Sequence, residues 1–386
     1  MNEKTIETFK QIQKRKTLYL PKKLRPFFGT ITPKNNAVLF IGPRGVGKTT
    51  FLLHQIKDKH FLYITADNPL VAQSNLWEVG ETAFNEGYDG IVLDEVHRAK
   101  DWSIHLKALY DAFPGKTIWA SGSSSIVLRM GVADLSRRFS HVYMPLLSFR
   151  EYLVLKNSIE FPVFDPFNYE EDIVKEIVTS QNIIKEFKMY LNEGLRPIFL
   201  DWDYEEQLEN IIEKIIYFDI PYLVPQISEN HFRLMKAVLG YISLSNIPTI
   251  NVDSMCKKWG LSKVKLYQLI DAMHHVGLIR VIHKKGDANV YSKGAKMFLY
   301  DPSMYYVLKG STGNIREAYV ACALMEKDQD IAACPNEEEG DFIYHHLKLE
   351  IGGKKKSVKK SDFVFRDDME VPYDNAIPLW MLGFKY

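Results

Sequence analysis

Apolar and polar positions along the first 150 residues follow a pattern that predicts a parallel α/β domain. Four short runs are continuously apolar and are typical of buried strands, at 37–42, 61–67, 90–95 and 116–122. Stretches with apolar residues at helical spacing lie between them, at 49–57, 71–86 and 101–112. Buried strands that alternate with helices indicate a parallel sheet covered on both faces. A polar helix is predicted before this domain, over residues 4–14.

The pattern changes after about residue 150, where helical stretches follow one another without clear strands. Three helices and a two-stranded ribbon then follow, with the second strand at NVYSK (289–293), which is the order of a winged helix-turn-helix. A last helix at 316–326 precedes strand-like pieces that include DFIYHHLKLEI, SDFVFR and IPLWMLG. The predicted fold class is α/β, and the predicted parts are a lead-in (1–36), a parallel-sheet core (37–150), a helical lid (151–228), a winged helix (229–300) and a small α+β tail (301–386).

The bulk composition is that of a soluble globular protein. The chain has 386 residues, 46% of them hydrophobic and 25% charged, which is long enough for two to four domains. The net charge of +1 means that any basic surface must be local. Three cysteines in unrelated contexts argue against a disulfide framework or a zinc site and suit a reducing compartment. Because the N-terminus is charged and no apolar run is long enough to span a membrane, we expect a cytoplasmic protein that does not bind a membrane.

The strongest chemical motif follows the first predicted strand. It comprises Gly42, Pro43, Arg44, Gly45, Val46, Gly47, Lys48, Thr49 and Thr50. Glycines allow successive backbone N–H groups to point at phosphates, and the following helix adds its positive end. Lys48 would reach the β- and γ-phosphates of a nucleotide, and the Thr49 hydroxyl would bind magnesium. Because the motif follows a strand and opens a helix, we interpret it as a P-loop and not as a chance tight turn.

A second motif, IVLDE, ends the third predicted strand. The apolar strand delivers Asp94 to its C-terminal end beside the P-loop, where a carboxylate can hold the magnesium shell. Glu95, the next residue, can orient and deprotonate an attacking water. The glutamate favours ATP hydrolysis over a simple kinase activity. No guanine-reading N-K-x-D motif is evident, so ATP is the expected nucleotide and Mg²⁺ the expected metal.

Serines and arginines farther along supply two more candidate groups. The fourth predicted strand ends in SGSSS, where Ser121 or Ser123 can act as a polar sensor between the P-loop and the water, or can cap the next helix. We take Ser123 as the sensor candidate. Arg137 and Arg138 follow, and one of them, with Arg138 as the candidate, can contact the γ-phosphate of its own or a neighbouring subunit. The alternative is that these arginines are solvated or structural.

The motifs together resemble a large group of prokaryotic AAA-type ATPases. Segments in the order seen in that group are GPRGVGKTT, YITADNP, LDEVHRAKDW, SGSSS, the RR pair, PLLSFREYL, YLNEGLRP, KMFLYDPSMYYVL, IREAYVACAL and KSDFVF. The resemblance covers nearly the whole chain and implies an ATPase domain followed by a winged helix and a restriction-endonuclease-like domain. It places Lys48, Thr49, Asp94 and Glu95 in the nucleotide site. It does not supply a biological role.

The resemblance predicts a nuclease-like tail that is inactive. Such domains hold a metal with a helix glutamate, a strand aspartate and an E-x-K pair on the next strand. Glu317 and Asp362 fit the first two places. Where relatives carry the carboxylate and the lysine, this chain has Trp380 and Leu382. We therefore expect a structural or interaction module instead of a nuclease.

The predicted winged helix carries a local basic bias. Its basic residues are Lys257, Lys258, Lys263, Lys265, Arg280, Lys284, Lys285, Lys293 and Lys296, against only Asp253, Asp271 and Asp287. Basic residues on a recognition helix and a wing suit contacts with DNA phosphates, and Tyr267, Gln268 and His274 offer groups for base edges. Winged helices of AAA-type proteins also serve as packing domains, so this alternative stays open.

Three hypotheses about function follow. In the first, the chain is a Mg²⁺-dependent ATPase whose hydrolysis drives a conformational switch on DNA. In the second, the same cycle drives a protein-interaction switch or scaffold that binds other proteins or its own copies. In the third, the chain binds ATP structurally and does not turn it over.

Overall fold

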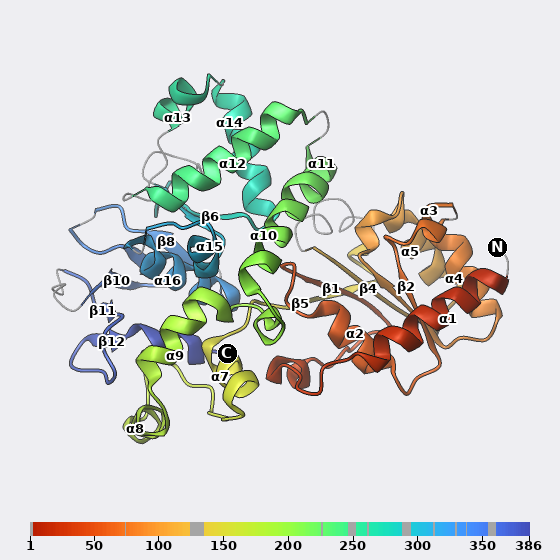
Figure 1. The fold of residues 1–386 in the computed structure, drawn as a ribbon, viewed down its shortest axis with the longest axis horizontal. Coiled ribbons are helices and arrows are strands. Elements are labelled where there is room, and N and C mark those ends of the chain that lie inside the picture. The colour runs from red at the N-terminus through yellow and green to blue at the C-terminus, as the bar shows by residue number, and fades with distance from the viewer. Residues whose placement is uncertain are drawn as a thin grey trace. The chain divides into compact units, whose positions relative to one another are not determined.

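The computed structural model shows two compact units, residues Met1–Pro145 and Leu146–Tyr386 (Figure 1). The structure describes residues 3–73, 75–123, 135–224, 227–245, 252–260, 262–287, 295–311, 313–328, 330–336, 338–353 and 360–386. The predicted strand NVYSK lies outside these residues. No helix within them is long and apolar enough to cross a membrane.

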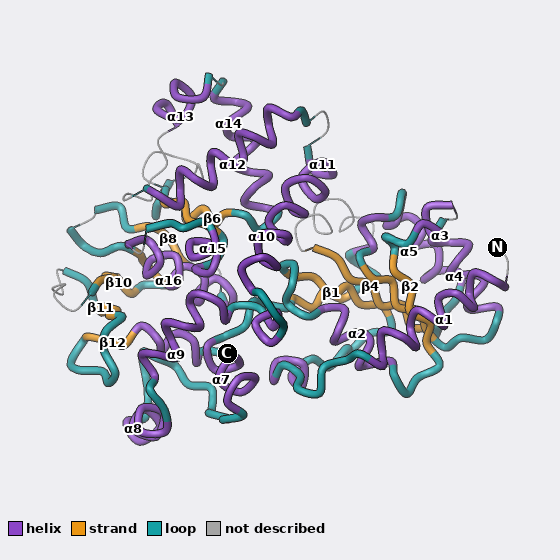
Figure 2. Tube along the Cα trace, in the orientation of Figure 1, coloured by secondary structure: helices purple, strands orange, loops and turns teal. Residues whose placement is uncertain are grey.

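The first unit is built on a five-stranded sheet, whose strands are orange in Figure 2, and every neighbouring pair of these strands is parallel. Its strands are β1 (Ala37–Gly42), β2 (Phe61–Thr65), β3 (Gly90–Asp94), β4 (Thr117–Ser123) and β5 (Ser140–Tyr143), in the order β2-β3-β4-β1-β5. The four strands predicted from the apolar runs are confirmed. β5 was not predicted, because its residues alternate between half-buried and exposed positions and lack a continuous apolar run.

Helices cover both faces of this sheet. They are α1 (Glu3–Leu18), α2 (Lys48–Ile56), α3 (Pro69–Gln73), α4 (Leu76–Asn85) and α5 (Trp102–Ala112), with 3-10 turns at Pro26–Thr30 and Val96–Arg98. One face forms the main core, where apolar residues of the strands pack with buried side chains of α1, α4 and α5. On α2, Phe51 packs against Phe40 of β1, with ring centroids 5.2 Å apart. Because side chains alternate along a strand, Phe40 and its neighbours Leu39 and Ile41 face opposite layers.

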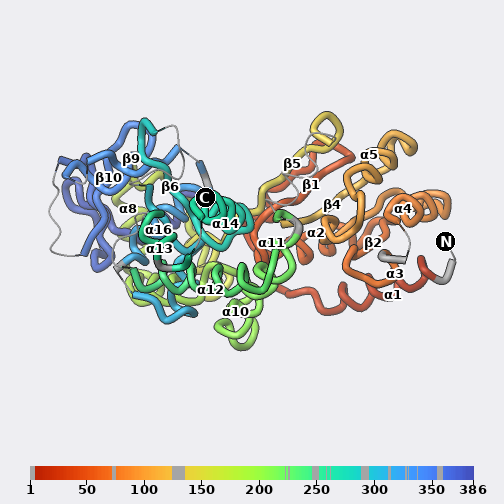
Figure 3. Tube along the Cα trace, turned by 90° about the horizontal axis from the view of Figure 1, so that it is seen from above, coloured from red at the N-terminus to blue at the C-terminus, as the bar shows by residue number. Residues whose placement is uncertain are grey.

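The second unit combines helices with a separate mixed sheet. Its helices are α7 (Phe149–Asn157), α8 (Glu171–Ser180), α9 (Ile183–Met189), α10 (Tyr204–Lys214), α11 (Ile220–Leu223), α12 (Glu229–Leu244), α13 (Val252–Trp259), α14 (Lys263–His275), α15 (Pro302–Val307) and α16 (Gly313–Lys327). Two π-helical turns lie at Tyr190–Gly194 and Ile215–Asp219, and two 3-10 turns lie at Pro197–Leu200 and Leu379–Phe384. Its strands are β6 (Ile279–Ile282), β7 (Lys296–Leu299), β8 (Ile331–Ala333), β9 (Phe342–Tyr344), β10 (Leu347–Gly352), β11 (Phe363–Arg366) and β12 (Ala376–Pro378). The five-stranded sheet has the order β12-β11-β10-β9-β8, and β6 pairs with β7. Figure 1 labels β8, β10, β11 and β12, and Figure 3 labels β9.

One strand prediction in this unit needs correction, and another stays a prediction. β6 pairs antiparallel with β7 at residues 296–299, whereas its predicted partner NVYSK lies outside the described residues. In IPLWMLG only the first two residues belong to a strand, because the chain turns into a 3-10 helix at Leu379. A short apolar run is compatible with either structure, and here the indole N–H of the fully buried Trp380 donates to the Glu370 carbonyl at 3.2 Å.

Candidate functional site

The P-loop lies between β1 and α2, where the sequence placed it. Gly45 and Gly47 have φ angles of 80° and 93°, a left-handed conformation that favours glycine. Gly42 needs glycine for another reason, because a Cβ there would lie 2.2 Å from the Met144 carbonyl oxygen. Gly47 is the N-cap of α2 and offers no side chain to cap it. The first N–H groups of α2 are therefore available to an anion such as a phosphate.

Lys48 is the first residue of α2, and its side chain folds back over the loop. The residue is only 5% exposed, and its ammonium group donates to the carbonyl oxygens of Gly42 and Pro43, both at 2.8 Å. A buried cation needs such acceptors, since removing a charge from water is costly without partners. The two contacts hold the ammonium group within the loop that is expected to surround the phosphates.

Asp94 accepts hydrogen bonds from three hydroxyl groups at the C-terminal end of β3. Thr49 donates to its Oδ2 at 2.7 Å, and Tyr63 donates to the same oxygen at 2.6 Å. Ser121 of β4 donates to Oδ1. Because Asp94 is only 3% exposed, these donors fix the orientation of its carboxylate. Burial, and then the neighbouring Asp94 carboxylate, raise the pKa of Tyr63 well above its usual value, so its phenol stays a hydrogen-bond donor.

Glu95 follows Asp94 with a backbone conformation that is rare for a residue other than glycine. Its φ and ψ angles are 52° and 42°, and its N–H donates to the Ser121 hydroxyl at 3.2 Å. The carboxylate lies 3.3 Å from the Arg44 guanidinium and 3.5 Å from Nε2 of the buried His97. Unusual backbone conformations are often found at active sites. The left-handed turn places the Glu95 side chain next to the P-loop arginine.

Ser123 and Arg138, the candidate sensor and arginine, have different surroundings. Ser123 ends β4 in register with Gly42 of β1. Among the residues that the structure describes, its buried hydroxyl has no hydrogen-bond partner, which leaves it available to a ligand. Arg138 makes a bidentate ion pair with Asp111, in which Nε and Nη2 donate to the two carboxylate oxygens at 2.8 and 2.9 Å. It would have to leave Asp111 to contact a phosphate, so its role stays a prediction.

Two residues near the site were missed by the sequence reasoning. One is Tyr63, whose hydroxyl reaches Asp94, and the signal for it was a tyrosine within a strand that is otherwise nearly all apolar. The other is Arg25, whose buried guanidinium donates to the carbonyl oxygens of Val46 and Pro145, at 2.9 and 2.8 Å. Nothing local in the sequence identifies Arg25, because its partners are distant in the chain. It ties the P-loop to the segment after β5.

The donor groups of this site fit a magnesium nucleotide. The Thr49 hydroxyl and the Asp94 carboxylate are hard oxygen ligands of the kind that Mg²⁺ prefers, and they already lie within 2.7 Å of each other. The uncapped start of α2 and the Lys48 ammonium group supply positive charge for phosphates. The Ser123 hydroxyl, which has no partner within the described part of the chain, adds a further group that can bind a ligand.

The predicted metal positions of the tail engage other partners. Glu317 accepts from the Lys296 ammonium group at 2.6 Å, whereas Asp362 accepts from the backbone N–H of Lys348 at 2.7 Å. Trp380 and Leu382, which stand where relatives have a carboxylate and a lysine, are fully buried. Over the described ranges, no group of three or more His, Cys, Asp or Glu side chains is placed to hold a metal ion.

The basic bias of the predicted winged helix is smaller in the structure than in the sequence. Arg280 is buried and pairs with Glu326, which is a correction to its assignment as a DNA-facing residue. Lys296 is also buried and binds both Glu317 and Asp341. Two of the nine basic residues therefore neutralise carboxylates inside the second unit. They do not add to a positive surface.

Two other residues of this block also have internal contacts. His274, one of the groups expected to contact base edges, accepts the Val281 N–H at 3.2 Å through Nδ1. Burial, and then the neighbouring His275, lower the pKa of His274 to about 4. This is a second correction, because His274 anchors β6 to α14. Lys263 pairs with Asp253 at 2.6 Å on the surface.

One family of known proteins matches the part of the chain that contains the P-loop. Residues 34–153, about a third of the chain, match the family model described as an AAA domain. This match supports an AAA-type P-loop ATPase. No curated protein is significantly similar to the chain.

Solved structures show distant likenesses. The Walker-type ATPase PABY2304 of Pyrococcus abyssi is 12% identical with a TM-score of 0.39, over 72% of this chain and 91% of that one. A variant of RuvB from Thermotoga maritima is 12% identical with a TM-score of 0.32, over 74% of this chain and 90% of that one. Alignments this distant support no statement about function.

Proposed function

We propose that the first unit hydrolyses ATP to ADP and phosphate in a magnesium-dependent reaction. The observation that carries the proposal is the 2.7 Å hydrogen bond between the Thr49 hydroxyl and the Asp94 carboxylate, with Glu95 directly after Asp94. This contact supports the proposal, because it joins the two residues that we expect to bind magnesium, and the expected base is the next residue in the chain. The match of residues 34–153 to an AAA domain supports the same activity.

The loop and the residues beside it have distinct roles in the proposed binding of the magnesium nucleotide. Backbone N–H groups from Gly45 to Thr50 surround the phosphates, and Lys48 neutralises charge on the β- and γ-phosphates. Thr49 and Asp94 hold the metal, and Tyr63 and Ser121 keep the Asp94 carboxylate in position. When held by these residues, magnesium would supply positive charge that offsets the charge developing during transfer.

The hydrolytic step needs a base and a leaving group. Water forms a bond to the γ-phosphorus while the bond from that phosphorus to the β–γ bridging oxygen breaks, and ADP leaves. The Glu95 carboxylate accepts the proton that the water loses. The Ser123 hydroxyl contacts the γ-phosphate or the water, because it is buried at the strand end beside Gly42. Arg138 is the candidate for an additional contact with the γ-phosphate.

Phosphate release by the purified chain tests this proposal. We expect Mg²⁺-dependent hydrolysis by the wild type, loss of ATP binding in Lys48→Ala, and retained binding in Glu95→Gln with turnover lower by about 10²–10⁴-fold. Equal turnover in the wild type and Glu95→Gln would contradict the role of Glu95. It would favour the hypothesis of a chain that binds ATP structurally.

The second unit is the part of the chain on which ATP hydrolysis is proposed to act. We propose that hydrolysis switches its conformation and so changes its affinity for a partner, since its helices directly follow the nucleotide domain in the chain. DNA is the first candidate for this partner, and it would bind through the exposed basic residues Lys257, Lys265 and Lys285.

The three free cysteines support a reducing compartment, and we place the activity in the cytoplasm.

The alternative is a protein partner, which is another protein or a second copy of the chain. Large apolar side chains of the second unit support it, because Trp202, Phe218, Leu244 and Val264 are 72%, 55%, 68% and 66% exposed. Mobility shifts with duplex DNA across a salt series separate the two. Binding that weakens steeply as salt rises supports DNA, and no binding at low salt contradicts it.

A further inference from the structure

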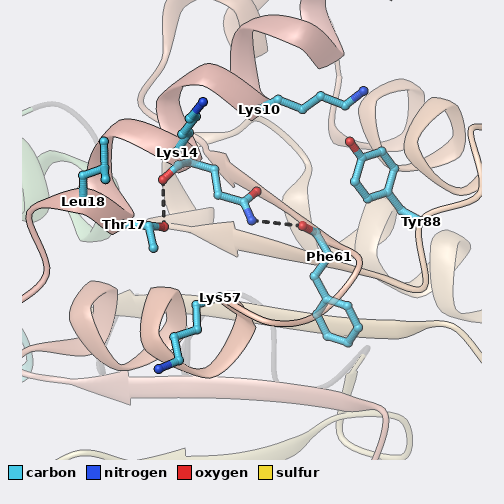
Figure 4. Close-up of a pocket in the computed structure, with 8 residues that line it drawn as sticks. Lys10, Lys14, Thr17, Leu18, Lys57, Phe61 and Tyr88 are labelled. Carbon is cyan, nitrogen blue, oxygen red and sulfur yellow. Dashed lines mark hydrogen bonds between the residues drawn. The ribbon is translucent and has the colours of Figure 1, made fainter.

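Helix α1 packs along the free edge of the nucleotide-binding sheet. Ile6 and Phe9 are buried in the main core, and β2 is an outer strand of the sheet (Figures 1 and 3). The side-chain amide of Gln13 donates to the Phe61 carbonyl at 3.1 Å and accepts the Tyr63 N–H at 2.8 Å. Figure 4 shows the bond that reaches Phe61. Gln13 thus satisfies backbone groups that an edge strand would otherwise leave unpaired.

One turn beyond Gln13, Lys16 begins a chain of hydrogen bonds that ends at the metal site. The Lys16 ammonium group donates to the Tyr63 hydroxyl at 3.1 Å, and that hydroxyl donates to Asp94 Oδ2 at 2.6 Å. The same oxygen accepts the Thr49 hydroxyl at 2.7 Å. A surface lysine of α1 is therefore connected through one buried phenol to both proposed magnesium ligands.

The direction of these bonds follows from the chemistry of the groups. The phenol of Tyr63 has a single proton to donate. Lys16 can only donate, and it occupies the hydroxyl oxygen from one side. The Tyr63 proton is then directed to Asp94. Hydrogen bonds in such a chain strengthen one another, especially where the acceptor is charged and the site is buried.

A second lysine of α1 also lies beside a tyrosine, and this pair serves as an internal control. Lys10 extends toward Tyr88 in Figure 4, and its ammonium group lies 5.8 Å from the centre of the Tyr88 ring. The Tyr88 ring stacks on His60, with centroids 4.6 Å apart. This pair joins the same helix to the same unit but makes no contact with Asp94 among the contacts that the described residues show.

We propose that Tyr63 is a positioning residue for Asp94 and that α1 holds it through Lys16, so that docking of α1 sets the affinity of the site for the magnesium nucleotide. This inference rests on the proposed function. It assigns to the segment before the P-loop a role in the metal site. Loss of the Tyr63 hydroxyl leaves Asp94 Oδ2 with one donor and a freer carboxylate, which weakens the magnesium-dependent part of binding without changing the phosphate cradle.

Binding of a fluorescent ATP analogue, measured once with excess EDTA and once with Mg²⁺, tests the inference. The readout is the gain in affinity that Mg²⁺ provides. We expect the gain to fall about ten-fold in Tyr63→Phe, the size of a lost hydrogen bond to a charged group, while the affinity in EDTA stays at the wild-type value. In Lys16→Met the gain falls about two- to five-fold, and Lys16→Arg restores it. The matched controls Tyr88→Phe and Lys10→Met keep the wild-type gain.

A double variant identifies the route of the effect. Because Lys16 acts through the Tyr63 hydroxyl, Lys16→Met combined with Tyr63→Phe loses no more of the gain than Tyr63→Phe alone. A larger loss in the double variant than in Tyr63→Phe alone would overturn the role of α1. A magnesium-dependent gain in Tyr63→Phe equal to that of the wild type would overturn the whole inference. If Tyr63→Phe does not fold, the exposed Lys16→Met and its Lys10→Met control decide alone. A wild type with no magnesium-dependent gain would instead contradict the proposed function.

Discussion

The guanidinium of Arg44 lies 3.3 Å from the carboxylate of Glu95, so a side chain of the P-loop contacts the group proposed to accept the proton of water. Both side chains are largely shielded from solvent, at 15% and 20% exposure. A triphosphate bound in the loop brings new negative charge close to Arg44. Nucleotide binding and the release of Glu95 from Arg44 are therefore expected to be coupled.

This coupling predicts that Glu95→Gln binds ATP more tightly than the wild type. The neutral amide no longer holds Arg44. An ion pair that keeps some exposure to solvent is worth about 0.2–1 kcal/mol, which corresponds to an affinity gain of up to about five-fold. Equilibrium binding of a fluorescent ATP analogue measures the effect. In the Arg44→Gln background, Glu95→Gln brings no such gain. An equal gain in both backgrounds would show that Arg44 is not the cause.

Two serines of β4 are expected to act in different ways. Ser121 contacts Asp94 and the Glu95 N–H, whereas Ser123 has a buried hydroxyl without a partner among the described residues. We expect Ser121→Ala to reduce both the magnesium-dependent gain in binding and turnover. Ser123→Ala reduces kcat by about ten-fold or more and leaves that gain intact, because its hydroxyl acts only on the γ-phosphate or the water. Steady-state kinetics and binding titrations on both variants distinguish these outcomes.

The sequence was sufficient for those parts of the fold and site that depend on local pattern. The apolar runs of β1 to β4 and the spacing of the P-loop placed Lys48, Thr49 and Asp94 correctly at strand and helix ends. The chain of contacts from Lys16 to Asp94 could not be predicted. It depends on the register that sets Thr65 of β2 opposite Asp94 of β3, and on the packing of α1 against an edge strand.

The count of basic residues in the predicted winged helix also failed to predict the charge of its surface, because tertiary packing decides which of these residues are buried. Arg280 and Lys296 belong to the same basic block as the exposed Lys265, and no local feature separates them. Only tertiary packing brings carboxylates such as Glu326 and Glu317 to the two buried residues. A surplus of charge in one segment therefore does not establish a charged surface.

The buried pair of Arg280 and Glu326 yields a prediction about stability. Arg280→Met leaves the Glu326 carboxylate buried without its main partner, and we expect the free energy of unfolding to fall by about 3–5 kcal/mol. Urea denaturation measures this change. Replacing both residues, Arg280→Met with Glu326→Leu, recovers most of the loss. The exposed control Lys265→Met changes stability by less than about 0.5 kcal/mol, and an equal effect of both single variants would contradict the assignment.

His274 predicts an acid-sensitive second unit. Burial, followed by the nearby His275 and Arg280, lowers its pKa to about 4 in the folded chain, while Asp271 acts in the opposite direction. The unfolded chain, with an ordinary histidine pKa of about 6.5, binds the proton more readily. The folded state is thus fully stable with respect to this group above pH 6.5 and loses about 3 kcal/mol as the pH falls toward 4.

Urea denaturation of the full chain at several pH values between 7.5 and 4.5 measures this loss. We expect His274→Asn, which keeps an acceptor for the Val281 N–H, to be less stable at pH 7.5 but to lose less stability on acidification than the wild type. The matched control for this substitution is His346→Asn, at an exposed position of the same unit. If His274→Asn and the wild type lose the same stability between pH 6.5 and 4.5, titration of His274 does not control acid unfolding, and the slope belongs to other groups.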